Sequence, residues 1–216
     1  MENSATLLRE QIRATLSSRC EAAFYTEKQA ARDTLASVVG EIPRGAFTEI
    51  AGSASSGRTS LLFSLLATVS AEQEFCTLLD VEDTFDPESA AAAGVRLSQI
   101  LWVRCRGNAE HALKAADMLA QGGGFGLVAI DLGDTPGKVV RRIPLAAWFR
   151  LRHAVENTKT ALVVVSQQIH AHSCSVLKIE INRSRTVWRG LLNGFEATAQ
   201  CIQNHRAQER SFTILR

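Results

Sequence analysis

Proline is scarce in this sequence, and long apolar runs are missing from it. The 216 residues include four prolines and 14 glycines, which excludes a collagen-like or low-complexity chain. No apolar run approaches the roughly 18 residues that a membrane-spanning helix needs. Hydrophobic residues nevertheless make up 46% of the chain, which is too many for a disordered protein. Length and composition therefore predict one globular domain of ordinary size with a short terminal extension.

Cysteine pairs at metal-binding spacing are also missing. The five cysteines are scattered along the chain and include no CxxC pair. This odd, dispersed set argues against both a disulfide framework and a zinc ribbon. Glu2, Arg9 and Arg13 stand where a secretory signal needs an apolar stretch. We therefore expect a soluble, cytoplasmic protein.

Net charge is small, but the charges are unevenly distributed along the chain. Residues 1–137 carry 11 Lys and Arg against 18 Asp and Glu, a net of −7. Residues 138–216 carry 13 against 4, a net of +9. A basic half suggests an anionic partner, either nucleic acid or an acidic protein surface. A solvated face balanced by the acidic half of the same fold explains the asymmetry equally well.

The order of the predicted elements indicates an α/β fold. Short apolar runs without period-two alternation alternate with helical patterns, which is typical of a parallel sheet covered on both faces. The predicted strands are 46–50, 75–80, 100–104, 127–131 and 161–167. The predicted helices are 59–69, 88–93, 108–120 and 145–156.

The two ends of the chain differ from this alternating centre. Residues 4–18 and 26–39 have helical patterns, so residues 1–40 are expected to form an N-terminal helical segment. Segments 175–182, 195–203 and 211–215 have strand patterns without helices between them. We therefore expect residues 41–216 to form a core domain whose last strands make an antiparallel extension.

A glycine-rich loop follows the first predicted strand and has the frame GxxxxGK[ST] at every position but one. It begins at Gly52 and continues through Ser56, Gly57, Arg58, Thr59 and Ser60 into a helix. Backbone N–H groups in such a loop wrap a β-phosphate, and the helix dipole adds to the attraction. The Thr59 hydroxyl would then contact Mg²⁺. Asp131, at the end of a later strand, would make the second contact on the Mg²⁺ side of the site.

Arg58 departs from the motif, because the phosphate-bridging residue is normally lysine. A guanidinium is planar, larger and more directional than an ammonium, so the two are not interchangeable in a crowded loop. The arginine would either swing away or occupy the phosphate space. We therefore expect that no nucleotide is required, with weak binding of ATP and Mg²⁺ left open.

Four separated blocks together resemble the RecA core, in RecA order. They are Ile42–Thr59, Leu79–Val95, Leu127–Asp131 and Val165–Gln167. The resemblance implies a RecA-like P-loop core: a mostly parallel sheet flanked by helices. It also implies that Glu82 matches the RecA glutamate that orients the attacking water. Gln167 matches the glutamine that senses the γ-phosphate.

Several RecA features are altered in this sequence. Ser89 stands where RecA has its adenine-stacking tyrosine, and Gln203 and His205 stand where two lysines reach the neighbouring protomer's ATP. The segment between Gln167 and Leu177 is much shorter than the second DNA-binding loop of RecA. With the missing phosphate lysine at Arg58, four parts of one ATP-dependent mechanism are altered, which argues that the mechanism does not operate here. Glu82 is then a vestigial catalytic candidate.

The combination of a RecA-like core, small size and these losses resembles the ImuA family. That resemblance implies an accessory protein of SOS-induced, mutagenic translesion synthesis, which is part of DNA repair after DNA damage. The implied partners are a Y-family polymerase homologue (ImuB-like), an error-prone replicative-type polymerase and RecA, with single-stranded DNA and a homo-oligomer as further candidates. Two alternatives stay open: an active DNA-dependent ATPase related to recombinases, and a RecA-fold regulator of cell division.

Two further groups of residues could form sites. His170, His172 and Cys174 would share one face of a strand, but no second cluster supplies a fourth ligand, so we expect no metal site. Eight arginines are candidates for a DNA-binding or partner-binding surface: Arg141, Arg142, Arg150, Arg152, Arg183, Arg185, Arg189 and Arg206. Trp148 and Phe149 among them could stack on bases, although packing against the sheet is favoured.

Overall fold

The computed structural model describes residues 42–189, 191–203 and 206–215. The predicted helices at 4–18 and 26–39, and with them the N-terminal segment 1–40, lie outside the described residues. Within those residues, no helix combines the length and apolar character needed to cross a bilayer.

One eight-stranded sheet forms the centre of the molecule, in the order β3-β2-β4-β5-β1-β6-β7-β8. Neighbouring strands are parallel from β3 through to β6, and β6, β7 and β8 pair antiparallel. The strands are β1 (Phe47–Gly52), β2 (Phe75–Asp80), β3 (Ile100–Arg104), β4 (Phe125–Asp131), β5 (Ala161–Ser166), β6 (Leu177–Arg189), β7 (Leu191–Gln203) and β8 (Arg206–Leu215).

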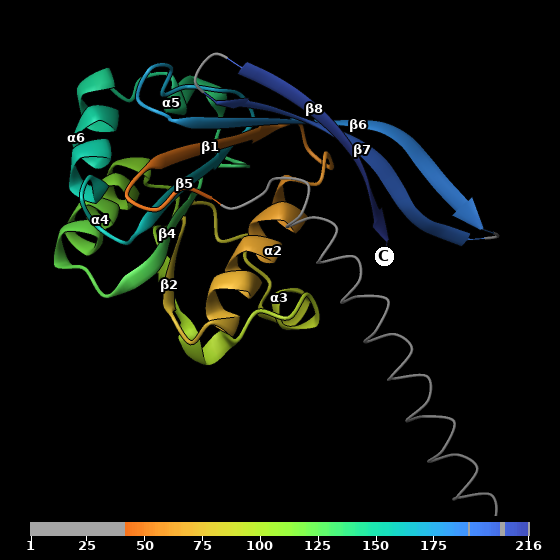
Figure 1. Ribbon diagram of the computed structural model, residues 1–216, viewed down its shortest axis with the longest axis horizontal. Coiled ribbons are helices and arrows are strands. Elements are labelled where there is room, and N and C mark those ends of the chain that lie inside the picture. The colour runs from red at the N-terminus through yellow and green to blue at the C-terminus, as the bar shows by residue number, and fades with distance from the viewer. Residues whose placement is uncertain (1–41, 190, 204–205, 216) are drawn as a thin grey trace, which may run out of the picture.

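Helices cover both faces of the parallel part of the sheet, as the continuous apolar strands predict (Figure 1). Alternate residues of β5 divide between the two layers, with Val163 packing on the α2 side and Val164 on the α4 and α6 side. The helices are α2 (Arg58–Ala71), α3 (Pro87–Ala92), α4 (Ala109–Gly122), α5 (Gly137–Val140) and α6 (Leu145–Val155), with a 3₁₀ turn at Leu97–Gln99.

The C-terminal strands form the expected antiparallel extension, but they are longer than predicted. Figure 1 shows β6, β7 and β8 running out beyond the helical layers as a curved ribbon. The predicted strand 175–182 continues to Arg189, and the strand predicted at 211–215 begins at Arg206. Ladder pairing between the strands extends them through polar segments that have no apolar strand pattern.

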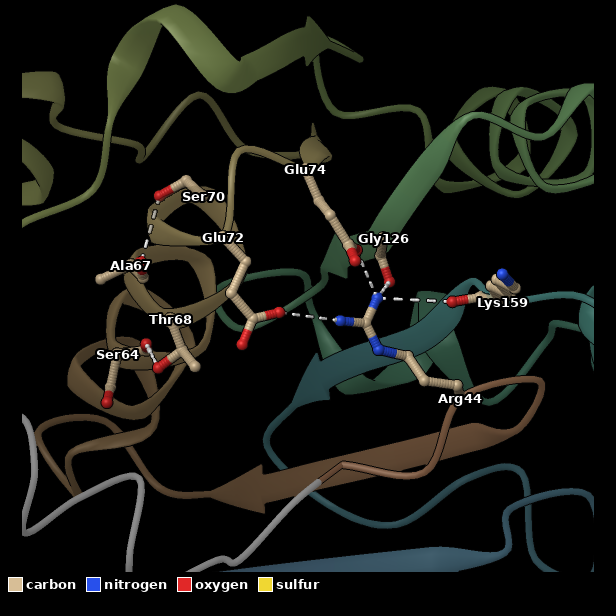
Figure 2. Close-up of polar contacts among 9 residues, drawn as sticks. All are labelled: Arg44, Ser64, Ala67, Thr68, Ser70, Glu72, Glu74, Gly126 and Lys159. Atoms are coloured by element: carbon tan, nitrogen blue, oxygen red, sulfur yellow. Dashed lines mark hydrogen bonds and ion pairs between the residues drawn. The ribbon is translucent and has the colours of Figure 1, made fainter.

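Arg44 connects the start of β1 to the amino ends of the parallel strands β2 and β4 (Figure 2). Its Nη1 donates to Glu74 Oε2 at 2.7 Å and to the carbonyl of Gly126 at 2.8 Å. The next residue, Gly45, has φ +66°, and a Cβ there would come 2.9 Å from the carbonyl oxygen of Thr158. The tight turn before β1 therefore requires glycine.

Candidate functional site

The carboxyl ends of four parallel strands meet at one edge of the sheet. Gly52 ends β1, Asp80 ends β2, Asp131 ends β4 and Ser166 ends β5. In the ladders Asp80 stands beside Asp131, and Ser166 stands beside Ala51. Ligands of open α/β sheets bind at this edge, so the sequence-predicted loop lies at the position that the fold favours.

The glycine-rich loop joins β1 to α2 and is tightly packed at its start. A Cβ on Gly52 would come 2.9 Å from the carbonyl oxygen of Ile181 and still closer to the Ser56 hydroxyl. Gly57 has φ +104°, a backbone conformation that L side chains rarely adopt. Ser56 is buried, and its hydroxyl has no hydrogen-bond partner among the described residues.

Arg58 is the first residue of α2, and its side chain folds back under this loop. The residue is only 5% exposed. Its Nη1 donates to the carbonyl of Gly52 at 2.7 Å, and its Nη2 donates to Asp134 Oδ1 at 2.9 Å. The guanidinium therefore links the start of the loop to the segment after β4, and its charge is already partnered inside the protein.

Asp131 lies against the same guanidinium. Its Oδ1 accepts a hydrogen bond from the backbone N–H of Gly133 at 2.8 Å. A Cβ on Gly133 would come 2.8 Å from Arg58 Nε and 2.9 Å from Asp131 Oδ1, so the three groups are closely packed. Burial raises the pKa of Asp131 to about 6, although the Gly133 N–H and the charge of Arg58 oppose the rise.

The remaining predicted site residues are only partly brought together. Thr59 is exposed and Ser60 is partly buried at the start of α2. Gln167 is exposed after β5, and its Nε2 donates to the carbonyl of Gly133 at 3.2 Å. Glu82 is partly buried after β2 and makes no hydrogen bond to this cluster within the described residues.

Two buried carboxylates at or near this edge serve the fold. Asp80 accepts hydrogen bonds from the backbone N–H groups of Thr84 and Phe85 and from the indole of Trp102. Glu49 of β1 is 1% exposed and accepts from the backbone N–H groups of His170 and Ala171 at 2.8 Å each. Sequence reasoning missed both of these roles, and it missed Asp134 as the partner of Arg58.

The segment that Glu49 holds is a loop and not a strand. The strand geometry considered for His170, His172 and Cys174 is therefore not found. It contains bends and turns, His172 has φ +46°, and Cys174 faces the interior while His172 is exposed. The alternation that would put the three side chains on one face of a strand is therefore wrong. Across residues 42–189, 191–203 and 206–215 no group of three or more His, Cys, Asp or Glu side chains is arranged to hold a metal ion.

A phosphate group meets an occupied site at the loop. The N–H groups of the loop, the Thr59 hydroxyl and the Asp131 carboxylate are the groups that could contact ATP and Mg²⁺. The Arg58 guanidinium, however, already donates to Gly52 and Asp134, so part of its positive charge is compensated within the protein. As arranged here, the guanidinium is engaged with the protein and does not take the free position of a phosphate-binding lysine.

A separate basic cleft of about 890 Å³ lies between the N-terminus of α4 and the α5–α6 segment. Its charged lining residues are Arg106, Lys114, Arg142, Arg150 and Glu110. Arg142 and Arg150 were predicted from the sequence, whereas Arg106 and Lys114 were missed because they belong to the acidic half of the chain. They could not have been found from charge counts along the sequence.

The other predicted arginines do not join this cleft. Arg141 lines a smaller cavity beside His170 and His172, and Arg152 pairs with Glu156 at 3.1 Å. Arg183 is exposed on β6. The side chains of Arg185, Arg189 and Arg206 lie outside the part of the chain that the structure describes.

The two aromatic residues near the cleft pack inward, as the favoured interpretation predicts. Trp148 is 1% exposed, and its ring centroid lies 6.0 Å from that of Phe47. Phe149 is half-buried against the same core. Neither ring lines the cleft.

Comparison with known proteins finds similarity to RecA. Residues 25–139, more than half of the chain, match the model of the RecA N-terminal domain. Protein RecA of Cutibacterium acnes is 39% identical over 93 residues, which is 43% of this chain and 26% of that protein. Protein RecA of C. acnes strain DSM 16379 / KPA171202 gives the same values. The chain thus spans about a quarter of the length of these curated relatives.

Proposed function

Because the chain belongs to the RecA N-terminal domain family, we propose that it is a RecA-like scaffold that does not hydrolyse ATP. We further propose that it acts in SOS-induced translesion DNA synthesis, where it binds a Y-family polymerase homologue. Single-stranded DNA is a second candidate ligand.

The observation that carries the non-catalytic part is the position of Arg58. Its guanidinium is nearly buried and bonded at both ends, to the Gly52 carbonyl and to the Asp134 carboxylate. Hydrogen bonds that involve a charged group contribute about 1.5–3 kcal/mol each. If these bonds are lost when a phosphate binds, the new contact between the phosphate and Arg58 must first compensate for them. We therefore expect the arginine to weaken the phosphate binding that a lysine would strengthen.

Other departures from RecA support the same proposal. The Ser89 hydroxyl donates at 2.5 Å to Asp86, the N-cap residue of α3, so this position holds a small side chain bonded to the helix cap where RecA has an adenine-stacking ring. The segment after Gln167 is short and is held against β1 by Glu49. Each change removes a different contact that ATP or DNA makes in RecA.

The translesion part of the proposal rests on the resemblance to ImuA, which combines a RecA-like core with these losses. The RecA family membership supports a role in DNA repair or recombination. A scaffold that has lost ATP turnover needs a partner that performs the chemistry, and a polymerase would supply it.

An ATPase assay with and without single-stranded DNA tests the non-catalytic role. We expect no turnover above background in either condition. DNA-stimulated hydrolysis that disappears in Glu82→Gln would overturn the proposal and establish the alternative, a DNA-dependent ATPase.

The Arg58→Lys variant tests the physical reason. Lysine is shorter than arginine and lacks its planar pair of donors, so we expect it to lose at least one of the bonds to Gly52 and Asp134, with a loss of about 1–3 kcal/mol in the free energy of unfolding. It also frees a cation for phosphate, so Mg²⁺ and ATP should raise the melting temperature of the variant but not of the wild type.

Arg44→Lys is the matched control for this measurement. Arg44 is also a multiply bonded arginine, but it lies at the opposite end of β1, so its variant should lose stability without any response to nucleotide (Figure 2). Equal stabilisation of wild type and Arg58→Lys by Mg²⁺ and ATP would contradict the role assigned to Arg58.

A further inference from the structure

The basic cleft between α4 and the α5–α6 segment is left unexplained by the candidate nucleotide loop. Its volume of about 890 Å³ lies within the range of sites that bind ligands. We propose that this cleft binds an acidic segment of a partner protein, with apolar side chains between its carboxylates. This proposal adds a binding site to the proposed scaffold function. It depends on that function only for the role of the partner, not for the binding itself.

Unbalanced positive charge identifies the kind of partner. Four cationic side chains line the cleft against the single carboxylate of Glu110. Arg150 pairs with Asp117 at 3.2 Å, whereas Arg106, Lys114 and Arg142 form no ion pair within the described residues. Like charges that converge on one cleft raise the local concentration of anionic ligands and favour their association.

The floor of the cleft is apolar, which a purely electrostatic site would not need. Leu113 is buried beneath it, Ile143 is partly buried, and Val139 is 39% exposed. Pro144 and Ala146 continue this surface at the start of α6. A peptide with apolar side chains would cover these groups while its carboxylates meet the rim, the arrangement found in protein interfaces.

The lining favours protein over nucleic acid as the occupant. Grooves that bind single strands combine positive charge with aromatic rings on which bases stack. Among the residues that the structure describes, no aromatic side chain lines this cleft, because Trp148 and Phe149 pack into the core on the other side of α6. Arginine at the rim and aliphatic groups beneath it suit a protein segment instead.

Selection from a displayed library of random 12-residue peptides against the full chain tests the proposal. We expect enriched peptides to contain several Asp or Glu residues with Leu, Ile or Val between them. In the double variant Lys114→Glu and Arg142→Glu, the dissociation constant of the best peptide, measured by fluorescence polarisation, should rise at least tenfold.

Arg96→Glu is the control for each replacement of the pair, because Arg96 is exposed beyond α3 on the other face of the sheet and its variant changes the charge as much as one of the two replacements does. This variant should bind the peptide as the wild type does, and circular dichroism should show that all variants fold. Peptides without acidic residues, peptides that bind the double variant equally well, or no enriched peptide would each overturn the proposal.

A labelled 12-nucleotide oligothymidylate that displaces the peptide and loses affinity in the double variant would assign the cleft to nucleic acid instead. The selection contains neither ATP nor DNA, so ATP turnover by the chain would overturn the non-catalytic role and leave this result standing.

Discussion

Arg58 and Asp131 show how the charges at the candidate site are compensated from within the protein. The arginine is bonded to a carbonyl and to Asp134, and it also lowers the cost of charging Asp131. That compensation is incomplete, because burial still raises the pKa of Asp131 to about 6. The carboxylate of Asp131 is therefore harder to ionise than a carboxylate in water, and the neighbouring cation, Arg58, is already bonded to Gly52 and Asp134.

Asp131→Asn should change how stability depends on pH. The pKa of Asp131 in the folded state, about 6, is higher than its ordinary value of 3.8, so the folded state binds more protons between these values. The contribution of Asp131 to the free energy of unfolding therefore falls as pH rises from about 4 to 6. Relative to wild type, the variant should gain up to about 3 kcal/mol over that range, measured by urea unfolding at pH 4, 5, 6 and 7. Parallel curves for the two proteins would contradict this assignment.

The sequence revealed the residue at position 58 but not its partners. The motif frame located Arg58 at the start of a helix, and its difference from lysine was apparent without a structure. Its bond to Asp134 depends on how a loop after β4 folds towards the loop after β1, which are 76 residues apart. Local sequence patterns do not reveal a contact between residues that are so far apart in the chain.

Glu49 connects two elements that the sequence leaves unrelated. It lies in β1, and it holds the start of the loop that follows β5 through the backbone N–H groups of His170 and Ala171. Its other oxygen accepts from the Ser175 hydroxyl at 2.9 Å. A single buried side chain thus fixes this short segment to β1.

Glu49→Ala should loosen this loop more than it disturbs β1. The buried N–H of Ala171 and the partly buried N–H of His170 lose their acceptor, at a cost of about 1–3 kcal/mol each, so we expect a loss of about 3 kcal/mol in the free energy of unfolding. Hydrogen exchange at His170 and Ala171 should accelerate as well. Thr48→Val is the control, because the buried Thr48 hydroxyl has no partner among the described residues, and its removal should be nearly neutral. Equal exchange rates in both variants would contradict the anchoring role.

Elements were predictable where the apolar pattern alone determines them. The bounds of β2 and β3 match their predictions, because each is a run of apolar and β-branched residues ended by a charge. The short α5 was missed, since four residues after Pro136 contain too little periodic signal. The ends of β6 and β8 were missed because ladder pairing, rather than local composition, extends them.

At the scale of the whole molecule, the C-terminal extension and the parallel core form one continuous sheet. β6 pairs with β1 in parallel, and Ala197 and Ala199 of β7 are buried in the same cluster as the inner face of α2. The acidic and basic halves of the sequence are likewise interleaved, because Arg106 and Lys114 meet Arg142 and Arg150 in one cleft. The division of charge at residue 138 therefore does not correspond to two halves of the surface.

Removal of residues 204–216 would make β7 the edge of this sheet. β7 pairs with β8 from Gly194 opposite Leu215 to Gln203 opposite Arg206, so truncation leaves that row of backbone groups unpaired. The outer strand β8 carries Glu209 and Arg210, charges that discourage edge-to-edge pairing, whereas β7 contains only one charged residue, Glu196. We expect the truncated chain to melt at a lower temperature and to self-associate more strongly than the full chain, by size-exclusion chromatography with light scattering over a concentration series. A truncated chain with the oligomeric state and melting temperature of the full chain would show that β8 contributes neither stability nor protection of the edge.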